Sequence, residues 1–497
     1  MTASTTAGAA ELIREALEVY GDDPQAAQAL QAYAGRLAEP VRIAVAGMVK
    51  AGKSTLLNAI IGEEIAPTDT GECTRIVTWY RYGHTPRITL HPMAGEPHTL
   101  PLKRVDGRLV FVLDGVRAEE VERLDVEWPS PALQAMTLID TPGIASVSQD
   151  VSARSLTFLT PEDTPSEADA VIYLMRHMHA VDLRFLESFR DTAAGRSGTV
   201  NAIAVLSRAD EVGAGRIDSL LSAGAIADRY SRDPNLRKLA LGVVPVAGLL
   251  AQSARTLRQP DFEALRLLAI LDRAARERML LSADRFRRST EPEGLTEEAR
   301  ESLLERYGLF GIRLAVVLIR NGFAEPTPLA HELARRSGLG LLVEALDRQF
   351  QARAEALKAR TALVAVENLL ETRPRQGTEH LAASLERLQA NAHEFRELRL
   401  LSALRTTGLD LSAALAAEAE QLIGGQGAAA HLRLGLEPGS GPEALAAEAR
   451  RRLVRWRAVA ESPLTARASL EACRVVIRSC EGVLADCTGM DRQPRSA

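Results

Sequence analysis

Residues 41–54 read Val41-Arg42-Ile43-Ala44-Val45-Ala46-Gly47-Met48-Val49-Lys50-Ala51-Gly52-Lys53-Ser54. The apolar first half predicts a buried strand, and the second half has the Gly-x4-Gly-Lys-Ser spacing of a phosphate-binding loop. Glycines in such a loop let backbone N–H groups surround phosphate oxygens, while the lysine ammonium reaches the terminal phosphates. The stretch therefore predicts a strand, a loop that binds a nucleoside triphosphate, and a helix that follows it.

The loop gives each residue type a place around the phosphates. We expect the Lys53 ammonium to contact the terminal phosphates, where it serves both binding and catalysis, and the Ser54 hydroxyl to ligate Mg²⁺. A helix over 55–61 would point its N-terminus at the anion. The residues predicted to bind nucleotide in this part of the chain are Gly47, Ala51, Gly52, Lys53, Ser54 and Thr55.

A second phosphate-side segment, Asp140-Thr141-Pro142-Gly143, comes directly after the predicted strand 136–139. We expect Asp140 to hold Mg²⁺ through a water molecule and the Gly143 N–H to sense the γ-phosphate. Taken alone, an aspartate before a Pro-Gly turn is a common pattern. Its place downstream of a phosphate loop makes it specific.

A threonine between these two segments should also reach Mg²⁺, from a loop whose ordering reports the γ-phosphate. Thr68, Thr70 and Thr74 are available. We favour Thr74, as metal ligand and catalytic residue, because it stands immediately before the strand predicted over 75–82. The alternative for Thr74 is an ordinary turn residue.

The segment Ser207-Arg208-Ala209-Asp210 follows the predicted strand 202–206, where GTP-binding proteins carry Asn/Thr-Lys-x-Asp. The Asp210 carboxylate would accept two hydrogen bonds from guanine, whereas adenine offers no matching donors. Arg208 replaces the usual lysine, and its planar guanidinium suits stacking on a base. We therefore predict that Ser207, Arg208 and Asp210 bind the base and that Asp210 selects GTP; the alternative for Asp210 is a plain helix cap.

Short apolar runs alternate with helical patterns between residues 41 and 246, which predicts an α/β domain with a mixed, mostly parallel sheet. The predicted strands are 41–46, 75–82, 87–91, 109–113, 124–128, 136–139, 170–175, 202–206 and 243–246.

Helical patterns dominate both ends of the chain. Residues 11–38 predict one or two helices with a break at Asp23-Pro24. Apolar residues from Leu339 to Val364 predict one long amphipathic helix that ends near Pro374. The helices expected after it are 381–395, 409–423, 442–461 and 463–487.

We therefore expect an all-α bundle, a neck or trunk, built from both termini. The predicted domains are 1–39, the N-terminal helices of the bundle; 40–336, the GTPase domain; and 337–497, the rest of the bundle. Residues 424–441 carry six glycines and one proline, which predicts a loop.

Composition sets bounds on these expectations. The 497 residues include 60 basic and 65 acidic side chains, a net charge of −5 that gives no general bias toward nucleic acid or anionic surfaces. Four cysteines without a Cys-x-x-Cys pair predict neither a disulfide framework nor a zinc site and suit a reducing cytoplasm. We find neither a signal-peptide pattern nor an apolar run near 18 residues, so we expect no membrane-spanning helix.

Several longer stretches are similar to one known family. The stretches are Ala51-Gly52-Lys53-Ser54-Thr55-Leu56-Leu57-Asn58-Ala59, Ile65-Ala66-Pro67-Thr68-Asp69, Thr74-Arg75-Ile76-Val77-Thr78-Trp79, Ser207-Arg208-Ala209-Asp210-Glu211 and Arg306-Tyr307-Gly308-Leu309-Phe310-Gly311-Ile312-Arg313. With them the chain resembles the dynamin-like GTPases of bacteria, and within these the isoniazid-inducible actinobacterial IniA/IniC type, nearest to the IniC branch. The resemblance covers most of the chain.

The resemblance implies a GTPase head that hydrolyses GTP to GDP and phosphate, and nucleotide-dependent association of heads. That association is either a head-to-head homodimer or a pairing with a second dynamin-like GTPase. The resemblance also implies membrane binding and remodelling, which places the protein in the cytoplasm, peripherally bound to the inner face of the plasma membrane.

One departure from eukaryotic dynamins concerns catalysis. Those proteins position the attacking water with a glutamine and a serine in the phosphate loop, where this chain has Val49 and Lys50. Related guanylate-binding GTPases carry an arginine finger at the position of Lys50. Our hypothesis is that Lys50 supplies positive charge to the transition state, and the alternative is a solvated lysine without a catalytic part.

Residues 424–441 are a candidate membrane tip. Three leucines of this loop (432, 434 and 436), if exposed, would enter a headgroup region, and the arginine-rich helix 442–461 would attract anionic lipid. An arginine-rich helix is more often a solvated face, and the rival tip is the turn 372–380.

Two other functions compete with the dynamin-like one. A GTPase of RNA or ribosome assembly shares the Gly-Lys-Ser-Thr-Leu-Leu-Asn signature, but such proteins normally add a basic RNA-binding module, so we expect no nucleic-acid partner. A nucleotide-regulated scaffold with little turnover is the third possibility.

Overall fold

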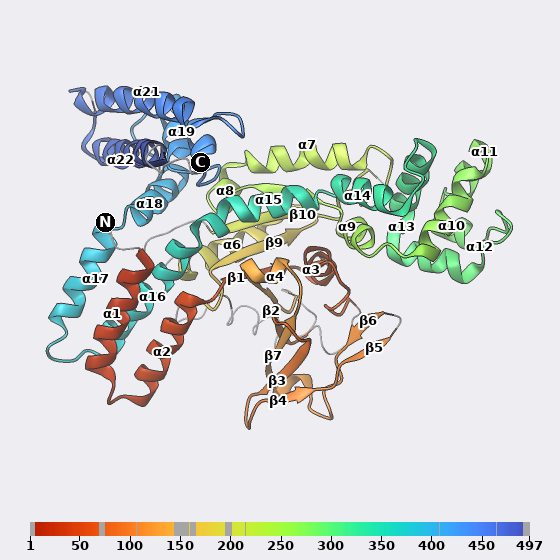
Figure 1. Cartoon of the computed structure of the whole chain (residues 1–497), viewed down its shortest axis with the longest axis horizontal. Coiled ribbons are helices and arrows are strands. Elements are labelled where there is room, and N and C mark those ends of the chain that lie inside the picture. Colours follow the sequence, from red (N-terminus) through yellow and green to blue (C-terminus); the bar gives the residue numbers. More distant parts are fainter. Residues whose placement is uncertain are drawn as a thin grey trace, which may run out of the picture.

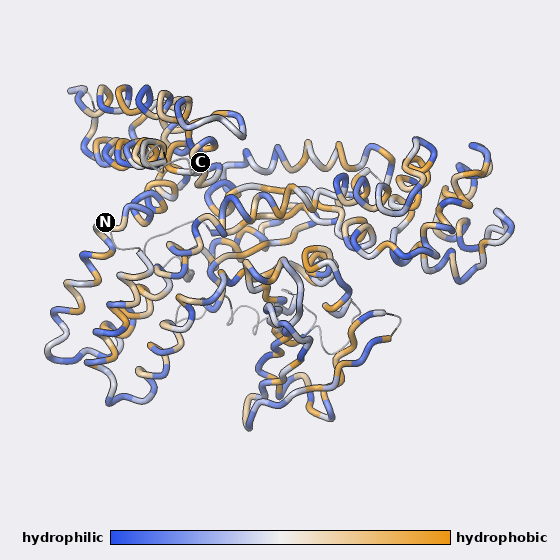
Figure 2. The backbone as a smooth tube through the Cα atoms, in the orientation of Figure 1, coloured by the Kyte–Doolittle hydropathy of each residue, from blue (hydrophilic) through white to orange (hydrophobic). Residues whose placement is uncertain are grey.

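The computed structural model describes residues 5–68, 75–105, 107–143, 159, 166–193, 201–213, 215–406, 408–463 and 465–490. A central sheet is flanked on one side by a helical lobe and on the other by two helical bundles (Figure 1). Orange, apolar segments concentrate along the central strands, while the outer helices alternate between apolar and hydrophilic residues (Figure 2).

The main sheet has nine strands in the order β11-β10-β9-β1-β8-β2-β7-β3-β4, and β5 pairs with β6 in a separate hairpin. Five strand pairs are parallel and three are antiparallel, so the predicted mixed, mostly parallel sheet is confirmed. The strands are β1 Val41–Gly47, β2 Val77–Tyr82, β3 Arg87–Pro92, β4 His98–Leu100, β5 Lys103–Val105, β6 Arg108–Val110, β7 Val121–Trp128, β8 Met136–Asp140, β9 Ala170–Met175, β10 Ala202–Ser207 and β11 Val243–Val246.

The parallel core of the sheet decides where a ligand can bind. β8, β1, β9, β10 and β11 run in one direction, and all seven residues of β1 are buried. The carboxyl ends of these strands therefore meet at one edge, which is where open α/β sheets bind ligands. Each predicted nucleotide-binding segment follows one of these strands.

Helices cover both faces of the sheet. On one face, apolar residues of α3 (Lys53–Ile61) and α15 (Leu339–Gln349) join the core beneath β1 and β8. On the other face, α6 (Ala180–Ala193) and α8 (Pro234–Arg237) contribute Phe185, Phe189 and Leu236. The short α4 (Ala132–Ala135) leads into β8.

A helical lobe follows the last strand and packs beside β10 and α7 (Ser219–Ser231). Its long helix α13 contains a non-helical residue, Gly308, at φ 60° and ψ 173°. The lobe consists of α9 Gly248–Arg255, α10 Gln259–Ile270, α11 Arg273–Met279, α12 Ala283–Arg288, α13 Glu297–Arg320 and α14 Pro326–Arg336.

The two bundles have separate cores. In the first, α1 (Thr5–Tyr20) and α2 (Pro24–Ala38) pack with α16 (Ala354–Thr372) and α17 (Glu379–Asn391), so the expected union of both ends of the chain is confirmed. The second bundle consists of α18 His393–Thr406, α19 Ala413–Leu422, α20 Ala430–Leu434, α21 Pro442–Glu461 and α22 Arg467–Met490. The helical part is therefore divided into two bundles.

Three expectations about the helical part are wrong. The helix predicted over 381–395 is divided at Ala392 between α17 and α18. The long helix predicted from Leu339 is broken after Gln349, because Leu339, Leu342 and Leu346 of α15 pack on the sheet while α16 packs on α1 and α2. Residues 424–441 are not loop throughout but contain α20. Among the described helices, none combines the length and apolar character needed to cross a bilayer.

Candidate nucleotide-binding site

The phosphate loop leaves the carboxyl end of β1 between two glycines with positive φ angles. Gly47 has φ 147°, and a Cβ atom there would collide with the Leu174 carbonyl oxygen of the neighbouring β9. Gly52 has φ 94° and lies at the N-terminus of α3. Both positions therefore require glycine, as the motif predicts, and the loop is fixed between a buried strand and a helix N-terminus.

Lys53 lies at the start of α3, beside Asp140 at the end of β8. Burial lowers the pKa of the Lys53 ammonium, and the Asp140 carboxylate opposes that shift. Lys50, in the exposed part of the loop, has the left-handed φ of 63° that is uncommon for a residue with a side chain.

The Ser54 hydroxyl donates a hydrogen bond of 3.0 Å to Asp140 Oδ2. Burial raises the pKa of Asp140 to about 6, against the opposing effects of Lys53 and Ser54. Asp140 Oδ1 is enclosed and accepts no hydrogen bond from the described residues. A buried carboxylate with an unpartnered oxygen beside a serine hydroxyl fits an oxygen-ligated divalent cation such as Mg²⁺.

Gly143 closes the phosphate side. A Cβ atom on Gly143 would lie 2.7 Å from Val49 Cγ2 and 3.2 Å from the Val49 backbone nitrogen, so this residue rests against the phosphate loop. Thr141 supports the arrangement because its hydroxyl donates to the Val45 carbonyl over 2.9 Å. Thr74, the predicted third metal residue, lies outside the described residues.

The base-side segment lines a pocket of about 180 Å³ together with the start of α3. Ser207, at the end of β10, donates to the Met175 carbonyl over 3.3 Å, and burial raises the pKa of the Asp210 carboxyl. The lining residues include Ala51, Gly52, Thr55, Leu56, Leu174, Val205, Ser207, Arg208, Asp210, Glu211, Val246, Gly248 and Leu249. Three phosphate-side residues, Ala51, Gly52 and Thr55, thus share one pocket with the base-side residues, and the hydrogen-bonded pair Ser54–Asp140 adjoins it at the start of α3.

Arg208 connects the two sides of this pocket, which its expected stacking role did not suggest. Its guanidinium donates to the Lys50 carbonyl over 3.0 Å and pairs with Glu211 over 2.7 Å. Glu211 also pairs with Arg176 over 2.9 Å. The carboxylate of Glu211 therefore holds Arg208 against the phosphate loop.

Asn58 is a second residue whose role was missed. Its side chain is buried on α3, accepts hydrogen bonds from Ile65 N (2.9 Å) and Ala66 N (2.7 Å), and donates to the Ala66 carbonyl (2.9 Å). These bonds fix the start of the segment that leaves α3. A lone asparagine within the apolar run 56–61 is the signal that could have indicated it.

The fold and the site define a P-loop GTPase domain of the dynamin family, and the model of that family matches residues 43–204. Isoniazid-induced protein IniC of Mycobacterium tuberculosis is 43% identical over 451 residues, which are 91% of this chain and 91% of that protein. The chain therefore belongs to the bacterial dynamin-like GTPases of the IniA/IniC type.

Two further relatives match over shorter stretches. Isoniazid-induced protein IniA of Mycobacterium tuberculosis is 33% identical over 28% of this chain and 21% of its own length. Bacterial dynamin-like protein of Nostoc punctiforme is 30% identical over 30% of this chain and 22% of its own length. A solved structure of an oligomerised bacterial dynamin pair covers 97% of this chain and 73% of its own, at 14% identity and a TM-score of 0.33, too low to support an argument.

Proposed function

We propose that this protein hydrolyses GTP to GDP and phosphate, and that hydrolysis is coupled to association of heads and to membrane binding. The observation that supports the catalytic part is the meeting of three groups of residues. The end of the phosphate loop (Ala51, Gly52) and Asp210 line one pocket, and Ser54, two positions after Gly52, donates to the Asp140 carboxylate.

We assign each residue of the site a role in binding the phosphates, the metal ion or the base. The loop 47–52 would bind the phosphates through backbone N–H groups, with Lys53 neutralising the terminal phosphates. Ser54 and Asp140, with Thr74, would hold Mg²⁺, which neutralises charge on the phosphates when bound. Gly143 would report the γ-phosphate through its N–H, and Asp210 would bind the guanine edge.

Lys50 is our candidate for the extra positive charge that hydrolysis needs. Its side chain is exposed and its backbone is held by Arg208, so the side chain can turn toward a γ-phosphate when two heads associate. Lys50→Ala should lower kcat about tenfold to a hundredfold and leave GTP affinity unchanged. Phosphate release measured at high and low protein concentration checks this. A Lys50→Ala variant that hydrolyses GTP at the wild-type rate would exclude a catalytic role for the Lys50 side chain.

The rest of the function is proposed from family membership. We propose a cytoplasmic protein, bound peripherally to anionic lipid on the inner face of the plasma membrane. It would associate as a head-to-head homodimer or with a second dynamin-like GTPase. Light scattering with GDP, and with GDP and aluminium fluoride, tests the association: a mass that never changes with nucleotide would exclude the homodimer.

We retain three parts of the chain, 1–39, 40–336 and 337–497, with one refinement. Because α15 packs on the sheet, we propose that the head extends to residue 349 and that the neck starts with α16. Cleavage at two protease sites, one inserted near residue 39 between α2 and β1 and one within the short turn of 3-10 helix Gln351–Arg353, should then release a head that still binds GTP.

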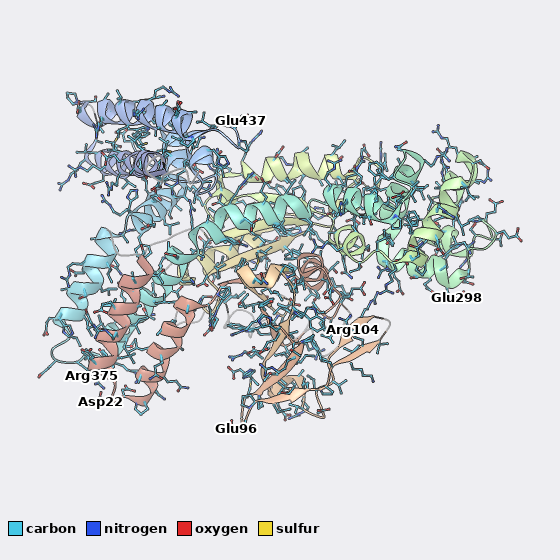
Figure 3. All side chains as sticks on the ribbon, in the orientation of Figure 1. Asp22, Glu96, Arg104, Glu298, Arg375 and Glu437 are labelled. Atoms are coloured by element: carbon cyan, nitrogen blue, oxygen red, sulfur yellow. The ribbon has the colours of Figure 1, made fainter. Side chains whose placement is uncertain are left out.

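The membrane tip considered at 424–441 required exposed leucines, and none of its three leucines is fully exposed. Leu434 is buried, and Leu432 and Leu436 are partly buried. The loop faces the head, since Gln349 donates to the Gly425 carbonyl over 3.1 Å, and Glu437 marks that end of the second bundle (Figure 3). The rival turn at 372–380 is charged, with Arg375 paired to Asp22 at the far end of the first bundle (Figure 3).

A further inference from the structure

The segment from Asp272 to Arg288 carries an unusual local charge. It comprises α11, the turn at 280–282 and α12, at the end of the lobe farthest from the bundles (Figure 1). It contains six arginines and three acidic residues, in a chain whose net charge is −5. We call it the α11–α12 segment.

Three of these arginines carry uncompensated charge. Arg278, Arg285 and Arg288 are exposed and have no acidic partner among the residues that the structure describes. They line an open groove of about 370 Å³ beside Asp284 and Glu291. By contrast, Arg273 pairs with Glu277 over 2.7 Å and Arg287 pairs with Asp284 over 3.4 Å.

The turn between the two helices presents a large apolar side chain to solvent. Leu281 is 61% exposed, whereas Met279, Leu280 and Phe286 around it are buried in the lobe. Burial of these three neighbours anchors the segment, so Leu281 is held outward beside the arginines. An exposed leucine next to arginines is typical of protein surfaces that insert into the lipid headgroup region.

The turn is also held in place by hydrogen bonds. The Ser282 hydroxyl caps α12 by accepting from Arg285 N over 3.2 Å, and Asp272 caps α11 by accepting from Ala275 N over 2.8 Å. Arg313 of α13 donates to the Leu280 carbonyl. Leu281 therefore projects from a preorganised turn, which lowers the entropy lost on binding.

We propose that the α11–α12 segment binds an anionic phospholipid surface, with Leu281 in the headgroup region and Arg278, Arg285 and Arg288 on lipid phosphates. This inference rests on the proposed membrane function and names the surface that performs it. The arginine-rich α21 is less suited, because Arg452 and Arg455 pair with Glu418 over 2.7 and 2.9 Å.

The same arginines could attract RNA, but two observations favour lipid. The aromatic residue of the segment, Phe286, is fully buried, so no ring is presented for stacking on a base. The exposed Leu281 gains nothing from a phosphate backbone but gains burial in a bilayer interface.

The test is sedimentation of the full-length protein with phosphatidylcholine vesicles, with and without phosphatidylglycerol. Two variants are compared with the wild type: Arg278→Gln/Arg285→Gln/Arg288→Gln and Leu281→Ser. Matched controls remove the same charges and the same kind of side chain elsewhere, at exposed positions: Arg184→Gln/Arg232→Gln/Arg266→Gln and Leu221→Ser. Basal GTP hydrolysis, measured without vesicles, should stay at the wild-type rate in all four.

We expect the wild type to bind only the anionic vesicles. At about 1 kcal/mol for each arginine, the triple variant should lose roughly a hundredfold in affinity, and Leu281→Ser several-fold, with both controls retaining binding. A triple variant that binds like its control overturns this inference and leaves the membrane function standing. A wild type that sediments with neither vesicle, or that binds RNA through these arginines instead, overturns both.

Discussion

At the scale of single residues, we expect Asp210 to decide which base the pocket accepts. Its carboxylate lies in the pocket with burial already raising its pKa, so it gains from hydrogen-bond donors that guanine supplies and adenine lacks. Asp210→Asn should weaken GTP binding by about 1 to 3 kcal/mol, roughly fivefold to 150-fold. Calorimetric titration with GTP measures this, and xanthosine triphosphate is the control, because the amide should bind xanthine better than the carboxylate does.

Asp140 should make stability depend on pH in the absence of nucleotide. Its pKa is raised to about 6, above the value near 3.9 of an unfolded chain. The folded protein therefore holds this proton more tightly, and its contribution to stability is present below about pH 4 and lost as the pH rises through about 6. Asp140→Asn should raise the free energy of unfolding by about 3 kcal/mol near pH 8 and change it little near pH 4.

Urea unfolding of the nucleotide-free protein at both pH values checks this prediction. An Asp140→Asn variant with the same stability difference at the two pH values would contradict it. Asp125→Asn, which removes a carboxylate of the same sheet outside the pocket, controls for general charge effects.

At the scale of elements, a buried ion network joins the segment after α3 to the helical lobe. Arg306 of α13 donates to Glu64 over 2.7 Å and to Asp261 of α10 over 2.8 Å, and all three side chains are at most 8% exposed. Arg306 also donates to the Thr256 carbonyl after α9 over 2.6 Å. The end of the phosphate-loop helix is thereby fixed to three helices of the lobe.

Arg306→Leu should destabilise the protein by about 3 to 5 kcal/mol, because Asp261 would lose its arginine partner while buried and Glu64 would keep only its longer pairs with Arg108 and Arg258. Adding Glu64→Gln and Asp261→Asn to the same chain should recover part of that loss, since amides tolerate burial better than unpaired carboxylates. Urea unfolding midpoints measure both. An Arg306→Leu variant whose free energy of unfolding lies within about 0.5 kcal/mol of the wild-type value would show that the network does not hold the elements together.

The regular elements were predictable from local patterns, and those that depend on distant contacts were not. Alternating and continuous apolar runs predicted β1, β8, β9 and β10 almost to the residue, because these strands are buried by their own composition. The division between α15 and α16 was missed because the apolar repeat continues across it, while the surfaces that each helix packs on are set by tertiary structure.

At the scale of the whole molecule, one buried carboxylate joins the head to the first bundle. Asp169, just before β9, pairs with Arg36 of α2 over 2.7 Å and accepts from the Thr361 hydroxyl of α16 over 3.3 Å. Asp169 also accepts from the Arg42 backbone N–H at the start of β1 over 2.9 Å. The starts of β1 and β9 are therefore bonded through one side chain to α2 and α16.

The site was more predictable than the assembly around it. Motif chemistry named Lys53, Ser54, Asp140 and Asp210 because phosphate, metal and guanine each demand particular residue types. The contact of Arg208 with Lys50 was not predicted, because the two residues lie 158 positions apart in the sequence and only the fold brings them together.

The most direct test of the central claim is calorimetric titration of the purified chain with GTP and with ATP, each with Mg²⁺. We predict saturable binding of GTP and at least about a hundredfold weaker binding of ATP, because adenine leaves Asp210 without its hydrogen bonds. Equal affinity for the two nucleotides, or no heat with either, would contradict a guanine-selective phosphate loop at this site.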